Sequence, residues 1–87
     1  MKLIKEDERG KTFDAGDFKV LYKLKSTISG DNSKNVEEEL YLVKGSAKLT
    51  LENKTWTEEA PAKIYFPAKT YHKIEALSDI TLILFEK

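Results

Sequence analysis

The clearest pattern in the chain is an alternation of apolar and polar positions with a period of two residues. In the segment 18–25 every even-numbered position is apolar, while three of the four odd-numbered positions are lysine and the fourth is Leu21. Successive side chains of a β-strand point to opposite faces of its sheet. The segment therefore predicts a strand with one buried apolar row and one row of solvent-facing lysines.

Similar short segments recur along the rest of the chain. Positions 46–51 alternate in the same way, and Asn53-Lys54 predicts a tight turn into a partner strand at 55–57. Three further strands are predicted at 64–66, at 71–76 and at 80–85, the last of which is apolar on both faces. Short strands separated by turns at intervals of about 8 to 12 residues are typical of an all-β sandwich or barrel.

One segment permits two interpretations. Val36, Leu40 and Val43 would share one face of a helix that ends at Gly45. However, the segment 40–43 is rich in residues that favour strands, and it leads directly into the alternating segment that follows. We therefore favour a strand here.

The size and composition of the chain limit its organisation. Its 87 residues predict one domain over 1–87, with an N-terminal strand or edge segment at 1–17, and it contains no cysteine. A domain of this size buries only about 60% of the surface that its unfolded chain exposes. A strand that is apolar on both faces also needs a cover, so we expect a homodimer.

Charge and hydropathy argue against two classes of partner. Fifteen basic residues balance fifteen acidic ones, whereas a nucleic-acid-binding protein normally has a clear basic excess. The longest apolar run, 80–85, is far shorter than the roughly 20 residues that span a bilayer. The first six residues contain no hydrophobic signal-peptide region. We expect a cytoplasmic protein that binds neither membranes nor nucleic acids.

Two short motifs have the spacing of a known family. Glu38 precedes Gly45 by seven positions, and Pro67 precedes His72 by five within the segment 64–72. These spacings, with the alternating strand and the hairpin between them, resemble the two signature motifs of the cupin superfamily. The resemblance covers about residues 18–87. It implies a small antiparallel β-barrel or jelly-roll sandwich.

The resemblance also identifies what is missing. Typical metal-binding cupins hold their ion with two histidines spaced one residue apart, a glutamate and a later histidine. Only Glu38 and His72 match this set, because the segment 31–37 is shortened and His72 is the one histidine of the chain. A tight transition-metal site usually has three or four good ligands. We expect no cofactor; a bound metal would use Glu38 and His72, with Asp31 or Asn32 as a further oxygen donor.

The same two residues are the candidate reactive groups. His72 shares a strand face with Ile74, Glu38 shares one with Leu40, and the resemblance directs both faces into the barrel. A carboxyl and an imidazole that meet in an apolar cavity can both be tuned for proton transfer. Two interpretations stay open: the pair is a functional site, or it consists of two polar residues that satisfy each other in the core.

These observations predict a cupin-type protein that binds a small polar ligand, for example a sugar, in the barrel mouth without a tightly bound metal. The candidate ligand-binding residues are Glu38, His72, Tyr22 and Tyr65, the tyrosines through their hydroxyl groups. One alternative is an isomerase, epimerase or lyase in which His72 and Glu38 are the catalytic acid and base, so enzymatic activity stays an open question.

A second alternative is an oligonucleotide-binding barrel, which also combines short strands, lysines and aromatic residues. The aromatic residues of such a barrel lie beside its lysines on an exposed face. In the segment 18–25 the aromatic and lysine rows are on opposite faces, which disfavours this alternative.

Overall fold

The computed structural model describes residues 1–32 and 35–86, without the side chains of residues 31 and 32. Within these residues every regular element is a strand, as predicted, and no helix long and apolar enough to cross a membrane occurs. The strands are β1 (Lys2–Asp7), β2 (Gly10–Asp14), β3 (Lys19–Lys23), β4 (Ile28–Asn32), β5 (Glu38–Lys44), β6 (Ser46–Leu51), β7 (Lys54–Glu59), β8 (Ala62–Phe66), β9 (His72–Ala76) and β10 (Ile80–Glu86). The segment with two interpretations is therefore the strand β5.

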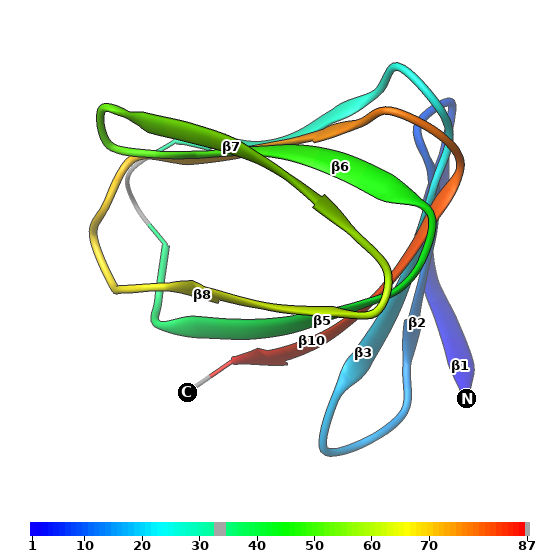
Figure 1. Ribbon diagram of the computed structural model, residues 1–87. Helices are drawn as coiled ribbons and strands as arrows, with labels where there is room; N and C mark the ends of the chain where they lie inside the picture. Colours follow the sequence, from blue (N-terminus) through cyan, green and yellow to red (C-terminus); the bar gives the residue numbers. More distant parts are fainter. Residues whose placement is uncertain (33–34, 87) are drawn as a thin grey trace.

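The strands form two antiparallel sheets that face each other (Figure 1). The larger sheet has the order β1-β2-β3-β10-β5-β8, and the smaller one has the order β4-β9-β6-β7. The sheets do not close into a barrel, so the sandwich form of the predicted fold is the one adopted. The alternative fold, an oligonucleotide-binding barrel, is not adopted.

The predicted hairpin is the pair β6–β7. Leu51 lies opposite Lys54, so the turn consists of Glu52 and Asn53, one residue earlier than predicted. Glu52 takes the left-handed conformation, with a φ of 53°. Lys54 is therefore the first residue of β7 and not part of the turn.

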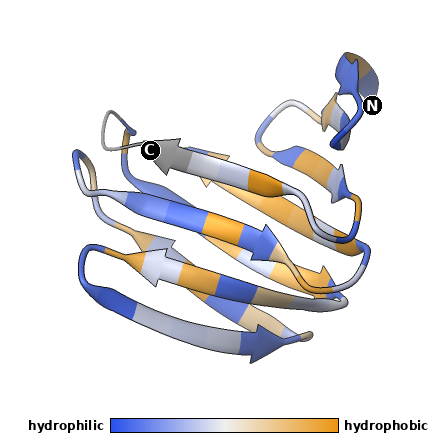
Figure 2. Cartoon of the chain, turned by 90° about the horizontal axis from the view of Figure 1, so that it is seen from above, coloured by the Kyte–Doolittle hydropathy of each residue, from blue (hydrophilic) through white to orange (hydrophobic). Residues whose placement is uncertain are grey.

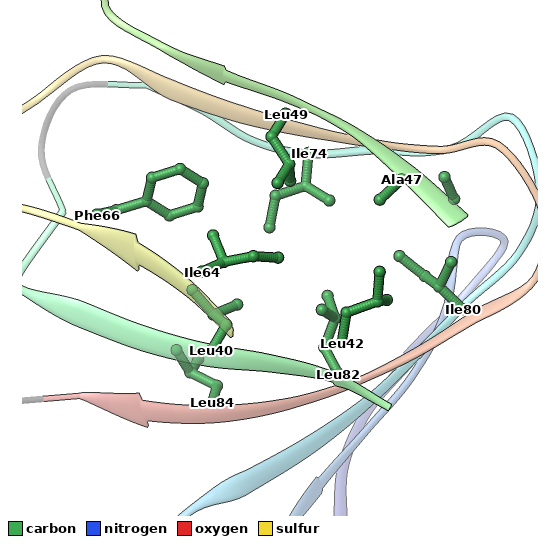
Figure 3. Close-up of a cluster of buried hydrophobic side chains, with 11 residues drawn as sticks. Leu40, Leu42, Ala47, Leu49, Ile64, Phe66, Ile74, Ile80, Leu82 and Leu84 are labelled. Carbon is green, nitrogen blue, oxygen red and sulfur yellow. The ribbon is translucent and has the colours of Figure 1, made fainter. Parts of the chain in front are cut away.

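The core lies between the two sheets, where apolar side chains from both point toward one another (Figure 3). Several strands alternate between hydrophobic and hydrophilic residues along their length (Figure 2). The buried apolar residues of this core are Leu40, Leu42, Ala47, Leu49, Ile64, Phe66, Ile74, Ala76, Ile80, Leu82 and Leu84. They come from five strands, so this core holds the two sheets together.

Strand β3 faces the opposite way from the prediction. Leu21 lies opposite Leu82 of the core and packs against it, so the row that contains Leu21 points between the sheets. Lys23 belongs to this row and is only 7% exposed, whereas Tyr22, from the predicted buried row, is on the outer face and partly exposed. The prediction of a solvated lysine row was therefore wrong for Lys23.

The outer face of the larger sheet explains this reversal. Aromatic rings form a row of contacts across it: Phe13 with Tyr22, at 5.8 Å between centroids, and Phe85 with both Phe18 and Tyr41, at 5.7 and 5.8 Å. This outer aromatic row gives β3 an apolar neighbourhood on its outer side as well. Phe18, predicted to be a core residue, is therefore only half-buried here.

Candidate functional site

The structure brings Glu38 and His72 together at one end of the sandwich. Glu38 is the first residue of β5 in the larger sheet, and His72 is the first residue of β9 in the smaller one. Atom Nε2 of His72 lies 3.3 Å from Oε1 of Glu38. The family resemblance implies inward faces for both side chains, and the contact between them joins the two sheets.

The imidazole ring of His72 is held from several sides. The Phe66 ring stacks on it with centroids 4.5 Å apart and an interplanar angle of 31°. Atom Nδ1 lies 3.4 Å from the carbonyl oxygen of Thr70. Gly30 has a φ of 87°, and a Cβ added there would lie 2.9 Å from both Cδ2 and Nε2. The ring therefore has a fixed orientation, and a glycine is needed where β4 passes it.

Burial and charge act in opposite directions on Glu38. Burial raises the pKa of the Glu38 carboxyl, and the nearby Glu86 adds to this effect, while His72 and Lys19 lower the pKa; the net direction is upward. Lys19 and Glu86 themselves form an ion pair with 2.7 Å between Nζ and Oε1. A carboxyl with a raised pKa beside an imidazole can hold or transfer a proton at this end of the sandwich.

The interior behind the pair is filled. A cavity between the sheets would be open only if the inward-facing apolar side chains left space there. All four of those concerned are buried in the core (Figure 3): Leu40, Leu42, Ile74 and Phe66. The His72 side chain is 5% exposed and that of Glu38 is 17% exposed. A ligand would therefore approach the pair from the side of Glu38.

The structure does not bring the two candidate tyrosines to this pair. Tyr65 points away from the core on β8, where its hydroxyl donates a hydrogen bond to the Glu37 carboxylate. Tyr22 lies opposite Thr81 of β10, whereas Glu38 lies opposite Glu86. Five residues along a strand correspond to roughly 16 Å, so Tyr22 belongs to the other end of the sheet.

Sequence reasoning missed two groups. The Lys19–Glu86 ion pair joins residues that are 67 positions apart, and no local pattern pointed to it. The buried Lys23 did have a signal, because Leu21 interrupts the lysine row and so suggested that this row contacts the core.

The residues described do not fit a transition-metal centre. The pair supplies one imidazole and one carboxylate, whereas such centres usually have three or four protein ligands. Among the side chains that the structure describes, those of residues 1–30 and 35–86, no three histidine, cysteine, aspartate or glutamate groups are placed to hold a metal ion. The side chains of Asp31 and Asn32, the further donors considered above, lie outside those described.

No protein-family model matches the chain, and no curated protein is similar to it in sequence. Solved structures are similar to it in fold. KdgF from Halomonas sp. has a TM-score of 0.79 and 14% identity, over 99% of this chain and 87% of that one. A cupin superfamily protein from Desulfitobacterium hafniense has a TM-score of 0.73 and 10% identity, over 97% and 72%. The chain has the cupin fold.

A larger protein contains the same cupin fold. The capsular polysaccharide assembling protein CapF from Staphylococcus aureus has a TM-score of 0.75 and 17% identity, over 98% of this chain and 28% of that one. At these identities the likeness establishes the fold alone, and one fold supports many functions.

Gly45, which follows Glu38 by seven positions, has a structural role at the other end of β5. It has a φ of 91°, and a Cβ added there would lie 2.4 Å from the carbonyl oxygen of Asp79 and 2.8 Å from Cγ2 of Ile80. The β5–β6 turn therefore packs directly against the β9–β10 turn.

Proposed function

We propose that this cupin binds a small polar ligand, for example a sugar, at the end of the sandwich that carries Glu38 and His72, and that it does so without a tightly bound metal. The observation that supports this proposal is the Glu38 carboxylate, which is 17% exposed and lies 3.3 Å from a buried imidazole. A partly exposed carboxylate can accept hydrogen bonds from ligand hydroxyl groups.

The surroundings of the pair favour a ligand that stays at the surface. Phe66 and Leu40 fill the space behind His72, so the side chains that the structure describes leave no deep cavity there for a ligand to enter. Lys19 and Glu86 add one positive and one negative group beside Glu38. A positive and two acidic groups side by side can donate hydrogen bonds to, and accept them from, the hydroxyl groups of a polyhydroxylated molecule. The likeness to CapF, described as a capsular polysaccharide assembling protein, is a further reason to begin with sugars.

The test is a calorimetric titration with neutral sugars, uronic acids and sugar phosphates. We expect binding by one of these classes, and we expect Glu38→Gln to weaken it by about tenfold or more, because a hydrogen bond to a charged group is lost. Glu59→Gln, at an exposed position of β7, is the matched control and should leave the affinity unchanged. A flat response to the whole panel, or equal affinities for both variants, would contradict the proposal.

The raised pKa of Glu38 favours a second candidate function, that of an isomerase, epimerase or lyase in which Glu38 and His72 exchange protons with the ligand. The same panel separates the two functions. Conversion of a bound sugar that is abolished in Glu38→Gln indicates an enzyme, whereas unchanged sugars indicate a binding protein.

We also propose a homodimer that forms through the part of the outer aromatic row made by Phe18, Tyr41 and Phe85. This row is half-buried in a small domain, and Val43 and Tyr65 extend it with exposed apolar surface. A symmetric pairing of two copies is the most common way to cover such a face.

Sedimentation velocity tests the homodimer with two valines of equal exposure. Val43 lies on the outer face of β5 and Val36 lies outside the sheets, and both are 47% exposed. We expect Val43→Lys to dissociate the dimer into monomers, because a charge would be buried in an apolar contact, and Val36→Lys to leave it intact. A monomeric parent protein would contradict this expectation.

A further inference from the structure

A cavity of about 500 Å³ lies at the end of the sandwich opposite to the Glu38–His72 pair. It is lined by the ends of several strands of the larger sheet, and its lining includes Tyr22, Lys23, Leu24, Lys44, Asp79 and Ile80. Ile80 and Glu86 are six residues apart on β10, so roughly 20 Å separates the two ends. The volume is within the range of about 300 to 1,000 Å³ that is typical of small-molecule sites.

Lys23 is the unusual residue of this cavity. It is 7% exposed, and its side chain follows Leu21 on the inward face of β3. No hydrogen bond or ion pair within the described part of the chain engages its ammonium group. Burial lowers the pKa of Lys23, and the charges of Arg9 and Lys5 lower it further, against an opposing effect of Asp7. Within the described part of the chain no buried side-chain nitrogen lacks a hydrogen-bond partner, so the ammonium group of Lys23 reaches the open space of the cavity although most of its side chain is covered.

The acidic residues of the lining do not supply a partner for this ammonium group. None of them forms an ion pair with Lys23: Glu6 lies 3.5 Å from Nζ of Lys11, Asp7 lies 3.4 Å from the Arg9 guanidinium, and Asp79 accepts the backbone N–H of Lys25 at 2.9 Å. The exposed Lys44 at the rim is, like Lys23, without an ion pair among the described residues. The cavity therefore presents two cations whose charges no carboxylate neutralises directly.

The walls beside these cations are partly apolar. Leu24 and Tyr22 are both partly exposed, and Ile80 closes the cavity toward the core. An apolar group that occupied this space would cover exposed side chains of the protein. A ligand that suits the cavity thus combines a negative charge with a small apolar body.

We propose that this cavity is a second binding site, which takes a small organic anion, a carboxylate or a phosphate ester, with Lys23 as its main cation. The anion neutralises Lys23, Lys44 assists at the rim, and the apolar body of the ligand lies against Leu24 and Tyr22. This gives Tyr22 a ligand contact, but in a different site from the one expected from the sequence. The site does not depend on the function proposed for Glu38 and His72.

The experiment titrates benzoate, phenyl phosphate and the neutral benzamide into the ¹⁵N-labelled full chain and follows amide chemical shifts. We expect one or both anions to bind and benzamide to bind at least about tenfold more weakly, because it cannot neutralise Lys23. The stronger anion distinguishes a carboxylate site from a phosphate site. The shifts should map to the ends of β2, β3 and β10.

Lysine-to-methionine variants complete the test, since methionine keeps the length of the side chain and removes its charge. Lys23→Met should weaken anion binding at least about tenfold, and the exposed rim variant Lys44→Met should weaken it by a smaller factor. Lys48→Met, at an exposed position of the other sheet, should have no effect. Glu38→Gln should also have no effect, which separates this site from the proposed sugar site.

Two results would overturn the proposal. The first is that neither anion binds. The second is that Lys23→Met and Lys48→Met bind benzoate and phenyl phosphate equally well. If Lys23→Met does not fold, the proposal is tested by Lys44→Met and by the comparison of the anions with benzamide. Lys44 is exposed, so its replacement should leave the fold intact. Unchanged anion binding in Lys44→Met together with equal binding of benzamide would then overturn the proposal.

Discussion

Replacing Phe66 with alanine is expected to lower the free energy of unfolding by about 3 to 5 kcal/mol. Phe66 is one of the largest fully buried side chains, and its ring lies between the sheets beside Ile64 and Ile74 (Figure 3). The substitution removes the packing of a complete ring and leaves a cavity that the surrounding strands can fill only in part. It also removes the ring that stacks on His72.

Urea denaturation measures this loss, and the preceding residue of the same strand provides the control. Tyr65 points outward and is partly exposed, so Tyr65→Ala should cost about 1 kcal/mol or less, chiefly from its hydrogen bond to Glu37. Equal losses for the two variants would show that the interior beside His72 is not packed as described. It would then have room for a ligand.

Much of the fold followed from the sequence because its signals are local. A period of two residues identifies a strand wherever one face is buried and the other solvated, as in β6. The Glu38–His72 contact was also within reach, since the resemblance to the cupin superfamily implies inward faces for both residues. Their separation of 3.3 Å confirms that the two residues meet.

The orientation of β3 could not be predicted in the same way. Alternation identifies the two faces of a strand, but it does not say which one the core covers when both have apolar neighbours. Here Ile83 on the outer face of β10 lies opposite Val20, and Leu82 on the inner face lies opposite Leu21. The register that distinguishes these arrangements depends on β10, about sixty residues further along the chain.

Whether the interior was open or filled was equally beyond the sequence. A row of inward-facing apolar residues is compatible with an empty cavity as well as with a packed core. The outcome depends on how far apart the two sheets lie and on whether their apolar side chains gather into one cluster between them. In this protein they do (Figure 3).

Replacing His72 with alanine is expected to cost about 2 to 4 kcal/mol near neutral pH, through two contributions. The first is the packing of the buried ring against Phe66, which does not depend on pH. The second is electrostatic. His72 opposes the rise in the pKa of Glu38 that burial causes, so its removal raises the pKa of Glu38 further.

The sign of the pH dependence follows from Glu38. Because its pKa is raised in the folded state, the folded protein binds more protons than the unfolded one in the interval above the ordinary value of 4.5. The contribution of Glu38 to stability is thus fully present below pH 4.5 and is lost as the pH rises through the raised pKa. In His72→Ala this pKa is higher still, so the additional loss grows from about pH 4 to about pH 7.

Denaturation of the parent protein and of His72→Ala at both pH values measures the difference directly. The double variant Glu38→Gln/His72→Ala, compared with Glu38→Gln, measures what the ring contributes once the titrating carboxyl of Glu38 is gone. A loss in His72→Ala that is independent of pH while Glu38 is present would mean that the imidazole only fills space. The pair would then be a structural contact between the two sheets, and the carboxylate alone would remain as the group available to a ligand.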